Sequence, residues 1–224
     1  MRAVLTSKQT SPSYRLVVPG AELRMLVLAA ESRGCVGVDI DSGAFVWASH
    51  APTPRLPGPF AVVSGEIAGA LEPPDPARPE ALELTGAPRL VGRMSLRRAE
   101  RLLAPLRHPP RLPLLGLGAN AVPYWTLNGQ GPSLALIELR QNPRLRWGQA
   151  GLECHFVWEG TPHELPVVNR TLVHHVEASG LFPASRGDVE RLLGYRPRRL
   201  LVMLTAPQDG YCHKAVGAIL PTLR

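Results

Sequence analysis

Proline and glycine set the strongest limit on what this chain can fold into. The 224 residues include 24 prolines and 21 glycines. Proline removes a backbone N–H donor and glycine weakens a helix, so this composition favours many short strands joined by turns. An apolar content of 45% is enough for a packed core and excludes a disordered chain. We therefore predict an α+β protein, built mostly from antiparallel β hairpins that form a sheet or a small barrel.

Several segments carry the local signals of hairpins. Apolar strand-like runs flank the turn at 41–43, the turn at 160–162 and the polar loop 206–210. A fourth hairpin is expected around Asn128-Gly129, joining residues 123–127 to 133–139, because Asn-Gly is a strong turn signal. Single strands are predicted at 22–31, 60–70 and 111–117.

Two short helices are predicted, near 95–106 and 187–194. In the first, apolar residues recur at the spacing of one helix face, at Leu96, Ala99, Leu103 and Leu106. Ser95 can cap its start and Pro105 closes its end. The sequence Glu-Arg-Leu-Leu occurs in both helices, at 100–103 and 190–193, each time before an Arg/Pro cluster and an apolar run. An internal duplication is therefore an open alternative.

The domain organisation hinges on residues 72–88. This stretch contains five prolines and four acidic side chains, a composition typical of a linker or a long surface excursion. A length of 224 residues fits one domain with such an excursion. The first interpretation is one compact unit over 1–224, and the alternative is a small β lobe at 1–70 followed by an α+β domain at 89–224.

The charge of the chain indicates an anionic partner. The formal net charge is +7 with a pI near 10, and all basic residues except Lys8 and Lys214 are arginines. Arginine keeps its charge and binds phosphate through a planar fork, so nucleic acid is the first partner to consider. The strand count also permits an oligonucleotide-binding barrel. The alternative is a GC-rich bacterial genome, which encodes arginine in place of lysine without any functional meaning.

Seven residues are the candidates for contact with nucleic acid. Arginines 97, 98 and 101 lie off the apolar face of the first helix, and further basic and aromatic residues follow along the chain. Exposed aromatic side chains next to arginines can stack on bases. The candidates are Arg97, Arg98, Arg101, Arg107, Trp125, Arg144 and Arg146.

Cysteine usage and hydropathy indicate a cytoplasmic protein. The three cysteines are widely spaced and never form a CxxC pair, so neither a disulfide framework nor a zinc ribbon is encoded. The first residues lack the apolar region of a signal peptide, and no apolar run is long enough to span a bilayer. No membrane association is expected.

One enzymatic alternative rests on Asp39. A strand that ends in this aspartate and runs into a glycine hairpin resembles the opening of ribonuclease-H-like nucleases, over about fifteen residues. The resemblance implies that Asp39 would hold a divalent metal. Two-metal phosphodiester chemistry needs several converging carboxylates, for which Glu66 and Glu138 are the other candidates. The alternating helices of that family are missing from the pattern.

A second enzymatic alternative uses the loop 205–214. It holds Cys212, His213 and Lys214, and a nucleophilic thiol needs a nearby base. Because neighbours on a strand point to opposite faces, the base would come from His174 or His175. The histidines and cysteines have no metal-ligand spacing, so no metal and no cofactor are expected. We therefore favour a non-enzymatic binding or adaptor module that contacts nucleic acid; a structural subunit that binds an acidic protein is the remaining alternative.

Overall fold

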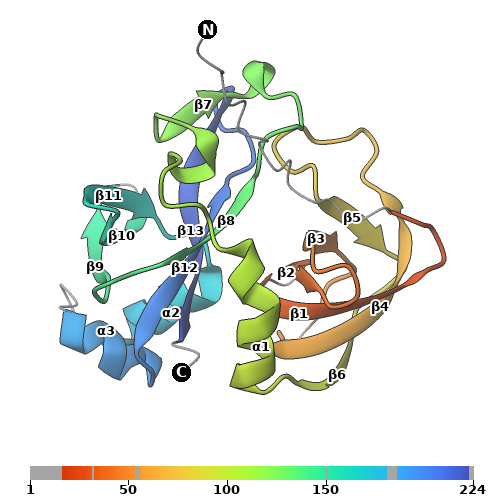
Figure 1. The fold of residues 1–224 in the computed structure, drawn as a ribbon, viewed down its shortest axis with the longest axis horizontal. Coiled ribbons are helices and arrows are strands. Elements are labelled where there is room, and N and C mark those ends of the chain that lie inside the picture. Colours follow the sequence, from red (N-terminus) through yellow and green to blue (C-terminus); the bar gives the residue numbers. More distant parts are fainter. Residues whose placement is uncertain (1–16, 32, 54–55, 150, 181–185, 222–224) are drawn as a thin grey trace, which may run out of the picture.

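Two groups of β-strands, one from each half of the chain, form the molecule (Figure 1). The structure, a computed structural model, describes residues 17–31, 33–53, 56–149, 151–180 and 186–221. The prediction of a mostly antiparallel β protein, built as a sheet or a small barrel with short helices, is confirmed, and the structure contains a barrel. Residues 1–16, which the alternative division assigned to a small β lobe, lie outside the described residues.

The first half forms a closed five-stranded barrel. Its strands are β1 (Glu22–Glu31), β2 (Gly34–Asp39), β3 (Phe45–Ser49), β4 (Ala61–Ala70) and β5 (Ala81–Leu84). They follow the order β1-β2-β3-β5-β4, and β4 pairs back with β1 to close the barrel. Only the β3–β5 pair is parallel. A sixth strand, β6 (Arg89–Arg93), pairs with β4 but is not one of the five strands that close the barrel. The predicted excursion at 72–88 thus contributes β5 to the barrel.

Strand β1 is buried on both faces, which explains its nearly continuous apolar run. Leu23, Met25 and Val27 belong to the core inside the barrel. The alternate residues Leu26 and Leu28 belong to a different core outside it. Successive side chains of β1 therefore alternate between the two faces of the strand. The sequence shows no polar–apolar alternation because both faces are buried.

The second half forms an antiparallel half-barrel. Strands β7 (Ala121–Pro123), β8 (Leu134–Glu138), β12 (Pro197–Leu204) and β13 (Tyr211–Pro221) follow the order β7-β13-β12-β8. A three-stranded sheet, in the order β11-β10-β9, is made by β9 (Arg144–Gly148), β10 (Gly151–Trp158) and β11 (Thr161–Pro166). A bridge between Val167 and Val216 links it to β13. The two sheets enclose their own apolar core.

A shared core joins the two halves. Leu28 and Val38, on the outer face of β1 and β2, are fully buried in one cluster with Leu201 and Met203 of β12. Phe45 and Trp47 of β3 pack against the same cluster. The outer face of β1, β2 and β3 is therefore covered by the second half of the chain.

Short helices lie at the margins of the sheets. They are α1 (Leu96–Leu103), α2 (Arg170–Ser179) and α3 (Arg186–Leu193), with 3₁₀ turns η1 (Ala104–Leu106), η2 (Leu114–Gly116) and η3 (Tyr124–Thr126). Helices α1 and α3 confirm the two predicted helices. The prediction omitted α2, whose start is marked by Asn169: its side-chain oxygen accepts a hydrogen bond from the Leu172 N–H.

Two local predictions are wrong. Residues 111–117 form no strand, because Pro113 lacks an N–H and Leu115 turns into the left-handed region with φ 58°. The Asn128-Gly129 hairpin also does not form. Residues 124–126 make a 3₁₀ turn, while β7 pairs with β13 and β8 pairs with β12. The long β12–β13 hairpin provides both partners in place of the local pairing.

The other predicted hairpins are confirmed. The β2–β3, β10–β11 and β12–β13 pairs are antiparallel and lie where the turns indicate. In the last turn, Asp209 and Gly210 both have positive φ, at 50° and 81°, as a tight two-residue hairpin loop requires. The Glu-Arg-Leu-Leu repeat leads into a strand only after α3, since 3₁₀ turns follow α1.

Candidate functional site

The arginines around α1 fall into an inner and an outer group. The inner group is neutralised by Glu100, whose carboxylate contacts Arg107 through Oε1 and Arg199 through Oε2, the latter at 2.6 Å. Arg107 also reaches Glu138 at 3.1 Å. Arg199 is only 4% exposed. These two arginines join α1 and the following turn to the half-barrel, which is a structural role.

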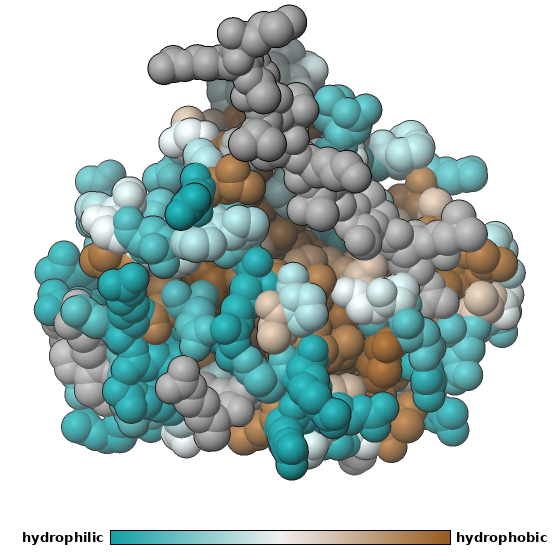
Figure 2. Space-filling model, in the orientation of Figure 1, coloured by the Kyte–Doolittle hydropathy of each residue, from teal (hydrophilic) through white to brown (hydrophobic). Residues whose placement is uncertain are grey.

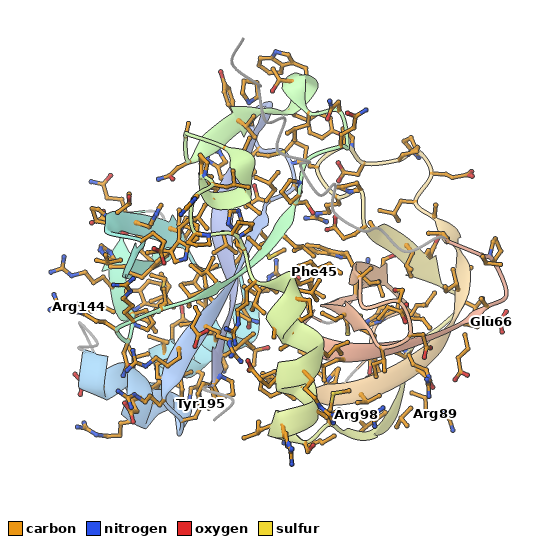
Figure 3. The ribbon with its side chains drawn as sticks, in the orientation of Figure 1. Phe45, Glu66, Arg89, Arg98, Arg144 and Tyr195 are labelled. Atoms are coloured by element: carbon orange, nitrogen blue, oxygen red, sulfur yellow. The ribbon has the colours of Figure 1, made fainter. Side chains whose placement is uncertain are left out.

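The outer group comprises five arginines on β6 and α1. All five are exposed, and within the described part of the chain none has a carboxylate within 4 Å. We call this surface the basic face; it consists of Arg89, Arg93, Arg97, Arg98 and Arg101. Figure 3 shows Arg89 and Arg98 on the same side of the molecule, and in Figure 2 hydrophilic residues gather over α1.

The sequence pattern positions these guanidinium groups. Ala99 and Leu103 are the buried residues of α1 and anchor it on the shared core. Arg97, Arg98 and Arg101 then point away from that core. Strand β6 adds the other two arginines, Arg89 and Arg93. It pairs with β4 along one edge, and its other edge has no strand partner in the described structure.

Apolar side chains lie within the basic face. Leu90 is 63% exposed, Val91 56% and Leu96 45%. Leu90 and Val91 belong to β6 and Leu96 begins α1, so all three lie on the two elements that carry the basic face. These elements therefore expose apolar as well as positively charged side chains.

The remaining candidates for nucleic-acid contact lie elsewhere. Arg144 and Arg146 are exposed on β9, and Figure 3 shows Arg144 on the side of the molecule away from Arg98. Trp125 is 70% exposed in η3 and packs edge-to-face on Tyr211, with ring centroids 5.7 Å apart. The structure thus brings together three of the seven candidates, Arg97, Arg98 and Arg101.

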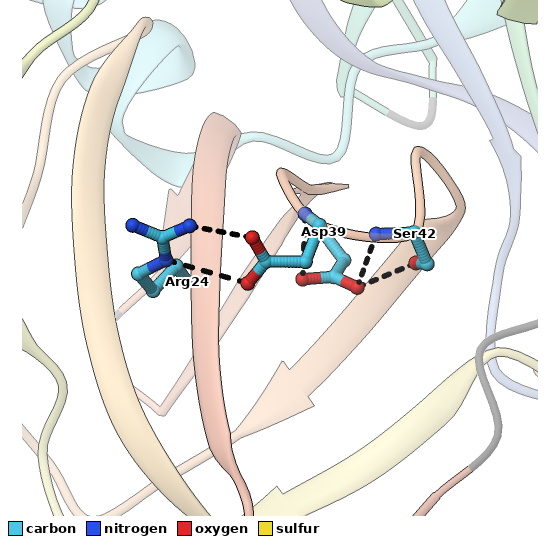
Figure 4. Close-up of polar contacts among 4 residues, drawn as sticks. Arg24, Asp39 and Ser42 are labelled. Carbon is cyan, nitrogen blue, oxygen red and sulfur yellow. Dashed lines mark hydrogen bonds and ion pairs between the residues drawn. The ribbon is translucent and has the colours of Figure 1, made fainter.

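The carboxylates of the metal-site hypothesis do not converge. Asp39 is fully buried and caps its own hairpin: its carboxylate accepts hydrogen bonds from Ser42 N at 3.1 Å and Ser42 Oγ at 2.5 Å (Figure 4). Glu66 is exposed on β4, in the barrel, whereas Glu138 lies on β8 in the half-barrel and pairs with Arg107. Across the described ranges, no group of three or more His, Cys, Asp or Glu side chains is arranged to hold a metal ion.

The loop 205–214 does not assemble a nucleophile. Cys212 is fully buried in the half-barrel core, and burial raises the pKa of its thiol. The backbone N–H of His213 donates to Thr205 Oγ1 at 3.0 Å. His174 is 86% exposed and lies beside Glu177, whereas His175 contacts Leu192 O. A thiol buried in apolar surroundings and a solvent-exposed imidazole cannot act as one reacting pair.

A buried Cys–His pair inside the barrel was not predicted. Cys35 Sγ lies 3.5 Å from His50 Nε2, and His50 Nδ1 lies 2.7 Å from Ala51 O. The Nδ1–H therefore donates to the carbonyl, which leaves Nε2 to accept the S–H. Burial raises the pKa of Cys35 to about 12, so it stays a thiol. Fifteen residues separate the pair in sequence, and only the β2–β3 hairpin brings them together.

Comparison with known proteins provides no relative. No protein-family model, no curated protein and no solved structure matches the chain. Among the described residues, no helix has both the length and the apolar character needed to cross a membrane. The geometry of the basic face is therefore the main basis for assigning a function.

Proposed function

We propose that the protein is a nucleic-acid-binding module whose basic face contacts the phosphate backbone. The observation that carries this proposal is the division of the arginines: Arg107 and Arg199 are paired with carboxylates, whereas the five of the basic face are not. Unpaired like charges repel one another, and a phosphate backbone is a partner that relieves this repulsion. Arg144 and Arg146 on β9 are also exposed without a carboxylate within 4 Å among the described residues, whereas β6 and α1 together carry five such arginines.

The barrel itself supports the proposal only by analogy. Five-stranded barrels, partly open, also form the oligonucleotide-binding folds, which bind on the face of their second and third strands. Here that face is covered, since Val38, Phe45 and Trp47 pack against the second half of the chain. Binding through β6 and α1 is compatible with this covering.

Fluorescence anisotropy tests the proposal with labelled single-stranded DNA, duplex DNA and RNA across a salt series. We expect log K to fall linearly with log salt. In a triple variant, Arg97→Gln, Arg98→Gln and Arg101→Gln, the slope should become shallower by up to about 3, since each phosphate contact contributes roughly 0.7–0.9.

The matched control is the double variant Arg144→Gln, Arg146→Gln on β9. It removes exposed arginines from a different part of the surface, so the salt dependence should stay close to that of the unchanged protein. An absence of binding at low salt rejects the proposal, and so does a triple variant with an unaltered slope. Including magnesium in one arm of the series would reveal any strand cleavage.

An acidic protein is the second candidate partner, and the exposed apolar side chains of β6 favour it. Phosphate backbone offers little for Leu90 and Val91, whereas an extended acidic chain pairing with the β6 edge would cover both. A double variant, Leu90→Ser with Val91→Ser, separates the two candidates. It should leave nucleic-acid affinity nearly unchanged, and it should abolish capture of an acidic protein by the immobilised chain.

A further inference from the structure

A small pocket lies at the end of β8 opposite to Glu138. Its volume is about 190 Å³, and its apolar wall is formed by Leu115, Leu117, Val122, Leu127 and Leu204. An apolar cavity of roughly 150 Å³ holds a benzene ring, whereas drug-sized ligands need roughly 300 Å³ or more. The pocket therefore has the size for a ligand of one or two rings.

The wall of the pocket is held in a strained conformation. Leu115 has φ 58°, which is unfavourable for a residue with a side chain. Its N–H donates to His108 Nε2 at 3.1 Å, and the neighbouring Leu117 carbonyl accepts from buried Lys214 Nζ at 2.6 Å. Non-glycine residues in this backbone region persist where surrounding contacts enforce them, and they cluster at ligand sites.

Ser133 and Thr126 line the pocket, and the hydroxyl group of each already donates a hydrogen bond within the protein. Ser133 Oγ donates to Glu80 Oε2 at 2.5 Å; burial raises the pKa of Glu80, and this hydrogen bond offsets part of that rise. Thr126 Oγ1 donates to Pro123 O at 2.7 Å. Each oxygen therefore keeps only lone pairs for a ligand, and the pocket offers two hydrogen-bond acceptors.

The polar rim also supplies a donor. Asn128 Oδ1 accepts from Gln130 N at 3.0 Å, so its amino group is the part of the amide that remains to donate. Glu80 is only 6% exposed, and its Oε1 has no hydrogen-bond partner among the described residues. This buried carboxylate holds the Ser133 proton away from the pocket.

We infer that the pocket binds a small, uncharged nitrogen heterocycle, whose N–H groups donate to Ser133 and Thr126 and whose ring packs on the leucine wall. The inference is independent of the proposed function, because the pocket is lined by Ser133 next to the start of β8, whereas Arg107, which follows α1 and η1, contacts Glu138 at the other end of that strand. The ligand is identified by its size, its lack of charge and its hydrogen-bond donors.

Isothermal titration calorimetry of the full chain tests the site with two probes, adenine and toluene. Adenine carries N–H donors on a ring system of the required size, whereas toluene only fills apolar space. We expect saturable adenine binding that does not change with salt, and weaker or absent binding of toluene. Thr126→Val should weaken adenine about fivefold through the loss of one acceptor, without altering toluene.

A blocking variant and its control test the location. Gly131 lines the pocket, and a Cβ built there meets no atom within 4 Å, so Gly131→Phe fills open space. Gly58 has equally open surroundings away from the pocket, and Gly58→Phe is the matched control. Gly131→Phe should abolish adenine binding, and Gly58→Phe should preserve it.

Three results would overturn the inference: no adenine binding to the unchanged protein, equal affinity for toluene, or normal adenine binding to Gly131→Phe. Near-UV circular dichroism shows whether each variant is folded. If Gly131→Phe is unfolded, Leu127→Trp provides a second way to block the pocket, because it enlarges an apolar side chain of the pocket wall. The triple arginine variant of α1 should bind adenine normally, so failure of the nucleic-acid proposal and failure of this one are distinguishable.

Discussion

At the scale of single residues, Glu100 has the most demanding position. It is the carboxylate partner of Arg199, which is almost completely buried and has Nε and Nη1 without hydrogen-bond partners in the described structure. Removing one member of a buried ion pair leaves the other charge unpaired in a low dielectric. We therefore expect Glu100→Gln to lower the free energy of unfolding by about 3 kcal/mol, measured by urea denaturation.

Glu177→Gln is the control for this prediction. Glu177 lies 3.8 Å from His174, and both side chains are exposed. An exposed pair contributes under about 1 kcal/mol. Equal destabilisation by the two substitutions would show that Arg199 does not depend on Glu100.

Gly37 lies where β1 and β2 approach so closely that a side chain would not fit. A Cβ at this position would lie 2.2 Å from Leu26 O, a backbone atom that cannot move aside alone. Gly37→Ala should therefore lower the free energy of unfolding by about 3 kcal/mol through overpacking. Gly69→Ala on β4, where no atom lies within 4 Å, should change it by under about 1 kcal/mol. A well-folded Gly37→Ala with unchanged stability would contradict the described register.

At the scale of elements, α2 depends on Asn169, the residue that precedes the helix and caps it. Asn169 Oδ1 caps the helix at Leu172 N, and its Nδ2 donates to Gly217 O at 3.0 Å. Asn169→Ala loses both bonds and should cost about 2 kcal/mol, whereas Asn169→Asp keeps the cap and should cost about half of that. Thermal unfolding followed by circular dichroism measures both, and an Asp variant as unstable as the Ala variant would contradict a role for the cap.

Elements whose signals are local were predictable from the sequence. The β12–β13 hairpin follows from Asp209-Gly210, and α1 follows from the spacing of Ala99 and Leu103. Barrel closure was not predictable, because the β1–β4 and β3–β5 pairs join segments about thirty or more residues apart and no short pattern encodes them. The same limit applies to the candidate site: the exposure of Arg97 follows from helix periodicity, but the pairing of Arg107 with Glu138 requires the half-barrel.

At the scale of the whole molecule, two partly buried histidines, His108 and His163, make stability depend on pH. Burial, and next the nearby Lys214, lower the pKa of His163; burial also lowers that of His108. The unfolded chain therefore binds protons at a higher pH than the folded one. Stability is complete above about pH 6.5 and falls below it, by at most about 1.4 kcal/mol per pH unit for each histidine.

Urea midpoints at pH 7.5 and 5.5 measure this dependence. His108→Gln should reduce the difference between the two midpoints, since one of the titrating groups is removed. His174→Gln should preserve it, because that imidazole is 86% exposed. Identical midpoints for the unchanged protein at both pH values would contradict the prediction.

The shared core also determines when the protein can finish folding during its synthesis. Strands β1 and β2 end by Asp39. Part of the cover of their outer face comes from α1 and β8, which begin at Leu96 and Leu134, but β12, which completes the cover together with β13, begins only at Pro197. At roughly 5–20 residues per second, the ribosome needs about 10–30 s to make the intervening chain. Through that interval α1 and β8 cover only part of the apolar outer face of the barrel. A nascent barrel is therefore a natural substrate for chaperones until β12 and β13 emerge.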